Sequence, residues 1–361
     1  MVEFTEILKC PNSEESLHYI SDQIEVNSYL GEWDLPFFRA FGVSAGFINE
    51  SRSWFYPIVD QIILLHPYYG IPQYNSDHSL FKDTFDKRRV FDYYNNIGYI
   101  SYNDHSIYAD SSKWLDYRQV SKDYIESSLS RARQYLPDKG QYLLDAGSGP
   151  IGLQQYLDLS KGYTCRICCD ISFSALQQAQ RNLTGPGLFI CCDILNTPII
   201  DNICDAVISQ HVIYHIPRKQ QKRAIEELYR ITKPGGTTAI VYSFFYHSIL
   251  MDATLFPVQL YRIIRHFLGK LFVKLIDSKP RLYFYSHGRK FFKNFYFSEH
   301  LKIYTWRSLN SYFLRLYIHE AFMGKRILNF FKSLEERYPE FMGTIGEYPI
   351  IVIDKPVSNA V

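Results

Sequence analysis

One short stretch, residues 141–152, limits the fold of this chain more than any other feature. Its sequence is Gln-Tyr-Leu-Leu-Asp-Ala-Gly-Ser-Gly-Pro-Ile-Gly. The apolar start predicts the end of a buried strand, and Gly147 and Gly149 allow the backbone to turn back beside a ligand. A helix from about residue 151 to residue 159 should then begin against that ligand. The same Gly-x-Gly-x-x-Gly spacing occurs in dinucleotide-binding turns, so a nicotinamide-dependent oxidoreductase is an alternative.

Four further strand-like runs follow this turn, and each ends in polar residues or comes after a turn. Asp170 closes the second run about twenty residues after the glycines, where a carboxylate can accept both hydroxyls of a ribose. A helix over 218–230, with apolar residues on one face, should cover the sheet. The runs are 165–169, then Leu188 to Cys191 ending at Cys192-Asp193-Ile194, then Ala206 to Ser209 ending at Gln210-His211, and finally Thr238 to Tyr242 after the turn Lys233-Pro234-Gly235-Gly236.

This succession resembles the class I S-adenosylmethionine-dependent methyltransferases over residues 110–243. The resemblance implies an α/β fold with a seven-stranded, mostly parallel Rossmann-like sheet, and S-adenosylmethionine as cofactor. It disfavours the oxidoreductase, because Pro150 lies in the turn and the Lys-Pro-Gly-Gly turn would have no explanation. We expect no metal. The residues implied to bind the cofactor are Asp145, Gly147, Ser148, Gly149, Asp170, Ile171, Asp193, Ile194, Gln210 and, from the segment before the first strand, Tyr117.

At 361 residues the chain is longer than such a core needs, so flanking parts are expected. We expect a helical N-terminal cap over 1–110 that contributes to the substrate pocket, and the cofactor-binding core over 111–243. Within the cap, the apolar and aromatic run 53–65 predicts a buried helix. A helix is also expected over 114–135, where apolar residues recur with a period near 3.6.

Residues 244–299 are predicted to form a helical, aromatic-rich insert between the fifth and sixth strands. Residues 260–276 carry a continuous apolar stripe opposite several basic residues, and residues 255–302 hold ten Lys and Arg against two Asp and Glu. A basic amphipathic helix of this kind packs on its own protein as a lid or lies on an anionic membrane surface. We favour the lid and keep a membrane contact through 255–276 as the alternative.

Residues 300–361 should complete the sheet. Residues 301–306 and 312–318 favour strands, and Lys325 to Tyr338 predicts a helix that stops at Pro339. Residues 348–353 predict a last strand. The resemblance places this strand antiparallel between the fifth and the sixth.

Methyl transfer from a sulfonium is an in-line displacement, to which a protein contributes alignment and, for a hydroxyl acceptor, a base. His211 and His215 follow the fourth strand, at the edge where open α/β sheets bind ligands, and they are the candidates for that base. The aromatic content of 17% predicts a partly apolar acceptor, a small or medium-sized metabolite methylated on a hydroxyl or an amine. Alternatives are a membrane lipid or isoprenoid acceptor, and a scaffold that binds the cofactor without catalysis.

The net charge of +2 gives no general attraction to nucleic acid, and no Asn-Pro-Pro-Tyr type motif follows the fourth strand, so we expect no nucleic-acid partner. Six of the seven cysteines lie on or beside predicted strands, as free apolar thiols would. Together with the lack of a secretory signal this predicts a cytoplasmic protein. The sequence does not predict an oligomeric state.

Overall fold

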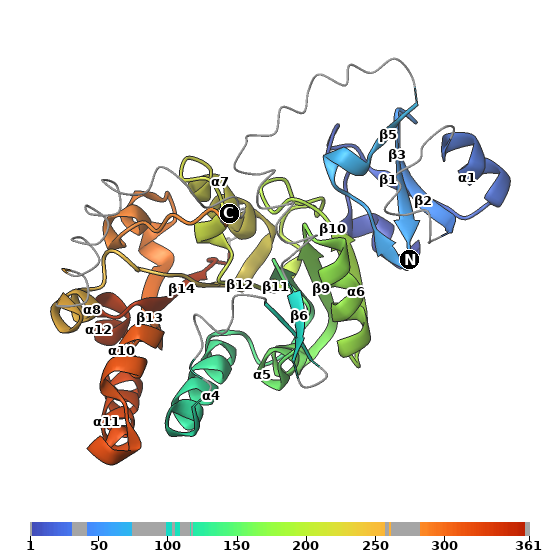
Figure 1. The fold of residues 1–361 in the computed structure, drawn as a ribbon. Helices are drawn as coiled ribbons and strands as arrows, with labels where there is room; N and C mark the ends of the chain where they lie inside the picture. The colour runs from blue at the N-terminus through green and yellow to red at the C-terminus, as the bar shows by residue number, and fades with distance from the viewer. Residues whose placement is uncertain are drawn as a thin grey trace, which may run out of the picture.

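The computed structural model describes residues 2–30, 42–73, 99–102, 105–108, 116, 118–256, 260 and 282–357 (Figure 1). A mixed sheet of twelve strands forms the centre of this part, in the order β1-β2-β3-β4-β10-β9-β8-β11-β12-β14-β13, with β5 paired to β3. The strands from β8 onward are β8 (Gly140–Ala146), β9 (Tyr163–Asp170), β10 (Gly187–Cys191), β11 (Cys204–Gln210), β12 (Thr232–Val241), β13 (Leu301–Arg307) and β14 (Tyr348–Asp354).

The strands from β10 to β12 run parallel to one another, and β14 lies antiparallel between β12 and β13, as expected. Since β13 is also antiparallel to β14, it points the same way as β12. The last residues of β8 to β13 and the first residues of β14 therefore meet along one border of the sheet, which we name the carboxyl edge. Ligands of open α/β sheets bind at this border.

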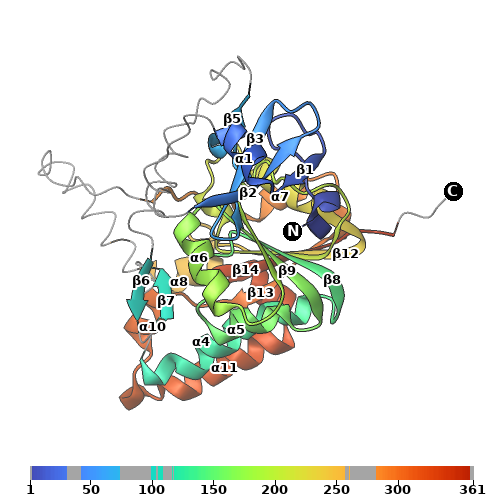
Figure 2. The same ribbon diagram turned by 90° about the vertical axis from the view of Figure 1, so that its right-hand side faces the viewer.

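Helices cover both faces of the sheet (Figure 2). On one face Leu228 of α7 packs in one cluster with Val207 of β11, and on the other face Leu129 of α4 and Leu328 of α11 pack with Ile208 of β11. Adjacent residues of β11 thus point to opposite layers, as the pleat of a strand requires. The helices and turns of 3-10 geometry (η) after residue 118 are η5 (Gln119–Ser121), α4 (Lys122–Ser130), η6 (Arg131–Tyr135), α5 (Gln154–Leu157), η7 (Asp158–Ser160), α6 (Phe173–Asn182), η8 (Ile213–His215), α7 (Gln221–Ile231), α8 (Ile249–Thr254), η9 (Arg289–Asn294), η10 (Ser298–His300), α10 (Ser311–Tyr317), η11 (Glu320–Phe322), α11 (Gly324–Arg337) and α12 (Pro339–Ile345).

The N-terminal part departs from the expected helical cap, because its described residues form mainly strands. The run 53–65, predicted as a helix, is instead strand β3, a turn and strand β4; Asp60 and Gln61 both have positive φ angles, 50° and 61°, as a tight hairpin turn requires. The expected count of seven strands is therefore wrong for the whole sheet, since these strands extend it beyond β10. The elements are η1 (Val2–Ile7), β1 (Leu17–Ile20), α1 (Gln23–Leu30), β2 (Val43–Asn49), β3 (Trp54–Val59), β4 (Ile62–Ile63), η3 (Pro67–Tyr69) and β5 (Ile71–Pro72), with a separate hairpin of β6 (Tyr99–Tyr102) and β7 (His105–Tyr108).

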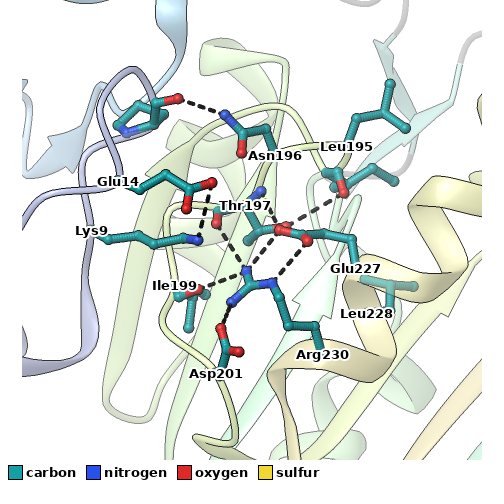
Figure 3. A network of polar contacts seen from close by, with 12 residues as sticks. Lys9, Glu14, Leu195, Asn196, Thr197, Ile199, Asp201, Glu227, Leu228 and Arg230 are labelled. Carbon is teal, nitrogen blue, oxygen red and sulfur yellow. Dashed lines mark hydrogen bonds and ion pairs between the residues drawn. The ribbon is translucent and has the colours of Figure 1, made fainter.

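The N-terminal part is joined to the core by backbone pairing and by one polar network. Ile63 of β4 pairs in parallel with Ile190 of β10. Arg230 of α7 forms ion pairs with Glu227 and Asp201 and donates to the carbonyls of residues 197 and 199, which fixes the loop after β10 (Figure 3). The same loop holds the N-terminal segment, because the side-chain amide of Asn196 donates to the carbonyl of residue 11 at 2.6 Å.

In the second half of the chain, one predicted strand is a helix, and most of one predicted helix lies outside the described residues. The segment 312–318, predicted as a strand, is helix α10, whose N-terminus is capped by the side chain of Asn310. Of the expected insert, residues 244–256, 260 and 282–299 lie within the described residues; the predicted helix 260–276 falls outside them apart from Leu260. In the described part of the chain, no helix combines the length and the apolar character needed to cross a bilayer.

A candidate cofactor and acceptor site at the carboxyl edge

The glycine turn follows β8 directly at the carboxyl edge. Gly147 and Gly149 have φ angles of 75° and 57°, in the left-handed region that favours glycine. A Cβ atom on Gly147 would lie 2.4 Å from the side chain of Val212, in the turn after β11. The hydroxyl of Ser148 donates to the carbonyl of Gly149 at 3.4 Å. The turn therefore needs glycine at residue 147 both for its backbone angle and for its close approach to the next loop.

Asp170, the last residue of β9, lies beside this turn. Its carboxylate accepts the amide of Gly149 on one oxygen and the amide of Ser172 on the other, both at 2.8 Å. The side chain is buried, and this burial raises the pKa of Asp170 to about 6. The carboxylate is therefore held in one orientation at the carboxyl edge, as the predicted ribose acceptor would have to be.

Asp145 has a different environment from the one expected for a cofactor ligand. Its carboxylate forms a buried ion pair with Arg166 of β9. Arg166 also donates to the carbonyl of Tyr156 at 2.7 Å and to the hydroxyl of Ser160 at 3.1 Å. The structure thus gives Asp145 a clear role in holding α5 and η7 on the sheet, and its contact with the cofactor stays a prediction.

The other predicted cofactor residues of strands two and three lie in neighbouring turns. The carbonyl of Ile171 accepts the thiol of Cys191 at 3.5 Å, which links the turns after β9 and β10. Asp193 accepts the amide of Leu195 at 2.9 Å, so its side chain shapes the turn after β10. Ile194 is buried in the main core cluster. The carboxyl edge thus brings Ile171 and Asp193 together with the glycine turn.

Gln210 ends β11 and has an unusual polar group. The amide oxygen Oε1 is buried and has no hydrogen-bond partner among the described residues. Buried polar atoms in native proteins are almost always paired, so an atom of this kind at a ligand-binding edge needs a ligand or an ordered water. The residue before it, Ser209, is already satisfied by the carbonyl of Ala146.

His211, one candidate base, is packed among aromatic rings. Its backbone has a φ angle of 61°, and its ring centroid lies 4.6 Å from that of Trp306 and 5.7 Å from that of Tyr348, both in edge-to-face geometry. Burial, together with the nearby charges of Arg307 and His215, lowers the pKa of His211 to about 3. The ring is therefore neutral near pH 7 but a weak base, which favours an orienting role over proton transfer.

His215, the second candidate base, is held by residues 282–288, which we name the strap. Its Nδ1 atom lies 2.8 Å from the carbonyl oxygen of Tyr283, so in the neutral ring Nδ1 carries the proton and Nε2 the lone pair. The amide of Tyr285 donates to the carbonyl of Tyr214 at 2.8 Å, and the ring of Phe284 lies 5.1 Å from that of Tyr214. The strap thus fixes the orientation of His215 from the outside.

Tyr117 lies outside the described residues. Its neighbour Arg118 forms an ion pair with Asp116 at 2.6 Å and donates to the carbonyls of Leu314 and Ile318. In the described part of the chain no group of His, Cys, Asp or Glu side chains could hold a metal ion, and all seven cysteines are buried free thiols.

A group of buried polar and aromatic residues at the ends of β13 and β14 was not predicted. It lies at the carboxyl edge beside His211 because β13 is parallel to β12 and β14 begins at that border. The sequence contained one signal for it. A charged residue stands next to an aromatic one at the end of β13, as Trp306-Arg307, and again at the start of β14, as Glu347-Tyr348. The group, which we name the edge cluster, consists of Trp306, Arg307, Asn310, Glu347 and Tyr348.

Comparison with known proteins identifies a methyltransferase domain within the chain. A family model described as "Methyltransferase domain" matches residues 144–240, from the glycine turn to the end of β12. Residues 144–240 thus match a methyltransferase domain, in agreement with the resemblance found in the sequence. S-adenosylmethionine, the cofactor implied by that resemblance, is consistent with this match.

The methyltransferase relatives match only part of the chain. The mouse protein named "Probable tRNA methyltransferase 9B" is 31% identical over 140 residues, which cover 38% of this chain and 28% of the relative. An "Uncharacterized methyltransferase" of Mycobacterium bovis is 32% identical over 109 residues, 30% of this chain and 41% of the relative. The match thus spans less than half the length of either relative.

Among solved structures, the complex between the Trm112 methyltransferase activator of Haloferax volcanii and a putative methyltransferase is similar over 65% of this chain and 92% of that chain. Its sequence identity is 16% and its TM-score is 0.41. Because the identity and the TM-score are low, the likeness to methyltransferases is based on the match of residues 144–240 and not on this structural comparison.

Proposed function

We propose that this methyltransferase chain transfers the methyl group of S-adenosylmethionine to a hydroxyl or amine of a small to medium-sized, partly apolar metabolite. The observation that carries the proposal is the arrangement of the glycine turn and Asp170 immediately beside the aromatic surroundings of His211. A nucleoside-binding turn and a pocket wall for an apolar acceptor thereby share one border of the sheet.

The residues of the cofactor half fit S-adenosylmethionine. The missing Cβ of Gly147 leaves room for close backbone approach, and the fixed carboxylate of Asp170 can accept the ribose hydroxyls. The buried oxygen of Gln210 can accept one hydrogen bond from the bound molecule. When bound, the cofactor supplies an electrophilic methyl group on a positively charged sulfur.

The residues of the acceptor half would align the nucleophile. His211 presents a neutral ring held in edge-to-face contact with Trp306 and Tyr348. His215, oriented by the carbonyl of Tyr283, can accept a hydrogen bond or a proton from the acceptor through Nε2. Because in-line displacement depends chiefly on alignment, these positions are where substitutions should change turnover most.

The proposal is tested with S-adenosylmethionine that carries a deuterated methyl group. Purified protein is incubated with a metabolite extract and, separately, with tRNA and with lipid vesicles, and mass spectrometry follows the label. Labelled small molecules are expected from the wild type and not from Gly147→Ala, which forces a Cβ into Val212. Gly185→Ala is the matched control, because a Cβ there meets no atom within 4 Å.

The remaining outcomes separate the alternatives. Label in tRNA would favour a nucleic-acid acceptor, which the name "Probable tRNA methyltransferase 9B" of the mouse, human and bovine relatives suggests. This outcome would contradict the prediction of no nucleic-acid partner. Label in lipid would favour the membrane alternative. Cofactor binding without label in any fraction would favour a scaffold.

A further inference from the structure

The edge cluster is built by a local irregularity of the sheet. Thr305 of β13 pairs with Pro349 and Arg307 pairs with Tyr348, so Trp306 has no partner of its own and forms a β-bulge. Bulges redirect side chains and are frequent beside active sites. Here the result is that the Arg307 guanidinium lies 5.1 Å from the ring centroid of Trp306 and 4.8 Å from that of Tyr348.

The backbone of the edge cluster is held by buried polar groups of α11 and η6. Arg131 donates to the carbonyl of Trp306 at 2.6 Å and forms a buried ion pair with Glu335 at 2.9 Å. Glu335 also accepts the amide of Ser308 at 2.7 Å and the hydroxyl of Tyr124 at 2.6 Å. The backbone that carries Trp306 and Arg307 is therefore fixed by groups that do not face the carboxyl edge.

Two buried polar atoms of the cluster have no hydrogen-bond partner among the described residues. They are the indole Nε1 of Trp306 and the carboxyl Oε1 of Glu347, whose residues are 1% and 0% exposed. The other oxygen of Glu347 accepts the side-chain amide of Asn310. Unpaired buried groups are costly and rare, so the unpaired indole donor beside a buried cation indicates a ligand that accepts hydrogen bonds.

The cluster adjoins the cofactor half of the site. His211 contacts Trp306 and Tyr348 through its ring, and the next residue, Val212, lies against Gly147 of the glycine turn. A molecule bound between the cluster and the turn would be on the acceptor side of the cofactor.

We propose that the edge cluster binds a carboxylate of the methyl acceptor, with the Arg307 guanidinium and the Trp306 indole N–H as hydrogen-bond donors. Arg307 supplies a positive charge in a fixed planar fork, the geometry that matches a carboxylate, and the stacked rings hold that fork in place. The inference rests on the proposed function and narrows its substrate to organic acids.

The test uses benzoate and its neutral isostere benzamide, titrated into protein saturated with S-adenosylhomocysteine and followed by calorimetry or ligand-observed NMR. Benzoate is expected to bind at least about tenfold more tightly than benzamide. This is the ratio of affinities expected when one hydrogen bond is made to a charged acceptor in place of a neutral one. Arg307→Met should abolish this preference and leave S-adenosylhomocysteine affinity within about twofold. Arg218→Met is the matched control, because Arg218 also stacks on a ring, that of Tyr285, but lies outside the cluster.

Trp306→Phe keeps an aromatic ring and removes only the N–H donor, so it tests the proposal should Arg307→Met fail to fold. It is expected to weaken benzoate several-fold and to weaken benzamide less, because a hydrogen bond to an ionised carboxylate is stronger than one to an amide. Equal affinities for the two probes in the wild type, or no saturable benzoate binding, would overturn the inference. Failure of S-adenosylhomocysteine itself to bind would instead count against the proposed function.

Discussion

At the scale of single residues, Asp170 is the proposed acceptor of the ribose hydroxyls, and its burial affects that role. Two backbone amides hold its carboxylate beside the glycine turn, yet burial raises its pKa to about 6. Ribose hydroxyls need an ionised acceptor, so binding should favour the deprotonated form. Cofactor affinity and the protonation of Asp170 are therefore linked.

We predict that the affinity for S-adenosylhomocysteine rises between pH 5 and pH 7 and levels off above pH 7. Below pH 6 the free protein holds a proton on Asp170 that binding must release, which costs affinity. Asp170→Asn should remove this pH dependence and weaken binding by about 1 to 3 kcal/mol, because a charged acceptor is lost. Calorimetry in buffers of different ionisation enthalpy measures affinity and proton release together. Equal affinity at pH 5 and pH 8 in the wild type would contradict the ribose assignment.

Glu347 has a raised pKa with a different consequence. It is fully buried, and burial raises its pKa to about 7 from an ordinary value near 4.5. Between these two values the folded protein keeps the proton and the unfolded chain has lost it. The contribution of Glu347 to the free energy of unfolding is therefore complete below pH 4.5 and is lost as the pH rises to 7.

Accordingly, Glu347→Gln should make the protein less sensitive to pH over this range. The wild type is expected to lose up to about 3 kcal/mol of unfolding free energy relative to the variant between pH 4.5 and pH 7. Urea denaturation at several pH values measures this difference. Glu336→Gln, at an exposed residue of α11, is the control and should follow the wild type. Parallel pH profiles for wild type and Glu347→Gln would show that the buried carboxyl is ionised throughout.

Features set by local backbone conformation could be predicted from the sequence. Contacts between side chains that are far apart in the sequence could not. The spacing of Gly147, Gly149 and Asp170 predicted a glycine turn with a carboxylate beside it, which the structure shows, because local conformation and strand order suffice for that. The pairing of Asp145 with Arg166 joins two strands 21 residues apart and has no local signal. Likewise, only the fold brings Trp306 beside His211 and so lowers the basicity of that ring.

At the scale of elements, strands and helices with a regular pattern were predicted well. Residues 325–338, with apolar side chains on one face, form α11, and 348–353 form β14. The errors were short segments rich in aromatic and β-branched residues, 53–65 and 312–318, where type depends on the surroundings. In 53–65, the tight turn at Asp60 and Gln61 makes the segment a hairpin of two strands. In 312–318, the cap from Asn310 starts a helix.

Helix α11 gives a prediction about stability. Its Glu335 is fully buried and pairs with the equally buried Arg131, so Glu335→Gln would leave a cation without its partner. We expect a loss of about 3 to 5 kcal/mol in the free energy of unfolding, measured by urea denaturation. The double variant Arg131→Met, Glu335→Gln should recover part of this loss, because it removes the unpaired cation and keeps a side-chain oxygen that accepts from Ser308 and Tyr124. An unchanged midpoint for Glu335→Gln would show that the pair does not hold the bulge.

At the scale of the whole molecule, the sequence predicted the layered core and missed the continuity of the sheet. The parallel direction of β8 to β12 and the antiparallel place of β14 between β12 and β13 follow from the resemblance. The junction with the N-terminal strands depends on the short strand β4 and on the loop contacts of residues 196–201 (Figure 3). Neither feature has a pattern long enough to be recognised in the sequence.

This continuity predicts that the N-terminal strands and the core unfold as one cooperative unit. Ile63 is fully buried at the junction and pairs with Ile190, so Ile63→Asp would place an unpaired carboxylate between the two parts. The cost should be about 3 kcal/mol or more and should fall on the junction first. Hydrogen exchange followed by mass spectrometry would then show β2 and β3 losing protection before β8 and β11, whereas in the wild type the four strands exchange together. Ile24→Asp, at a residue of α1 that is 82% exposed, should leave the exchange pattern unchanged. If β2 and β3 already exchange separately in the wild type, the two parts are independent domains, and the shared sheet does not couple the N-terminal strands to the cofactor turn.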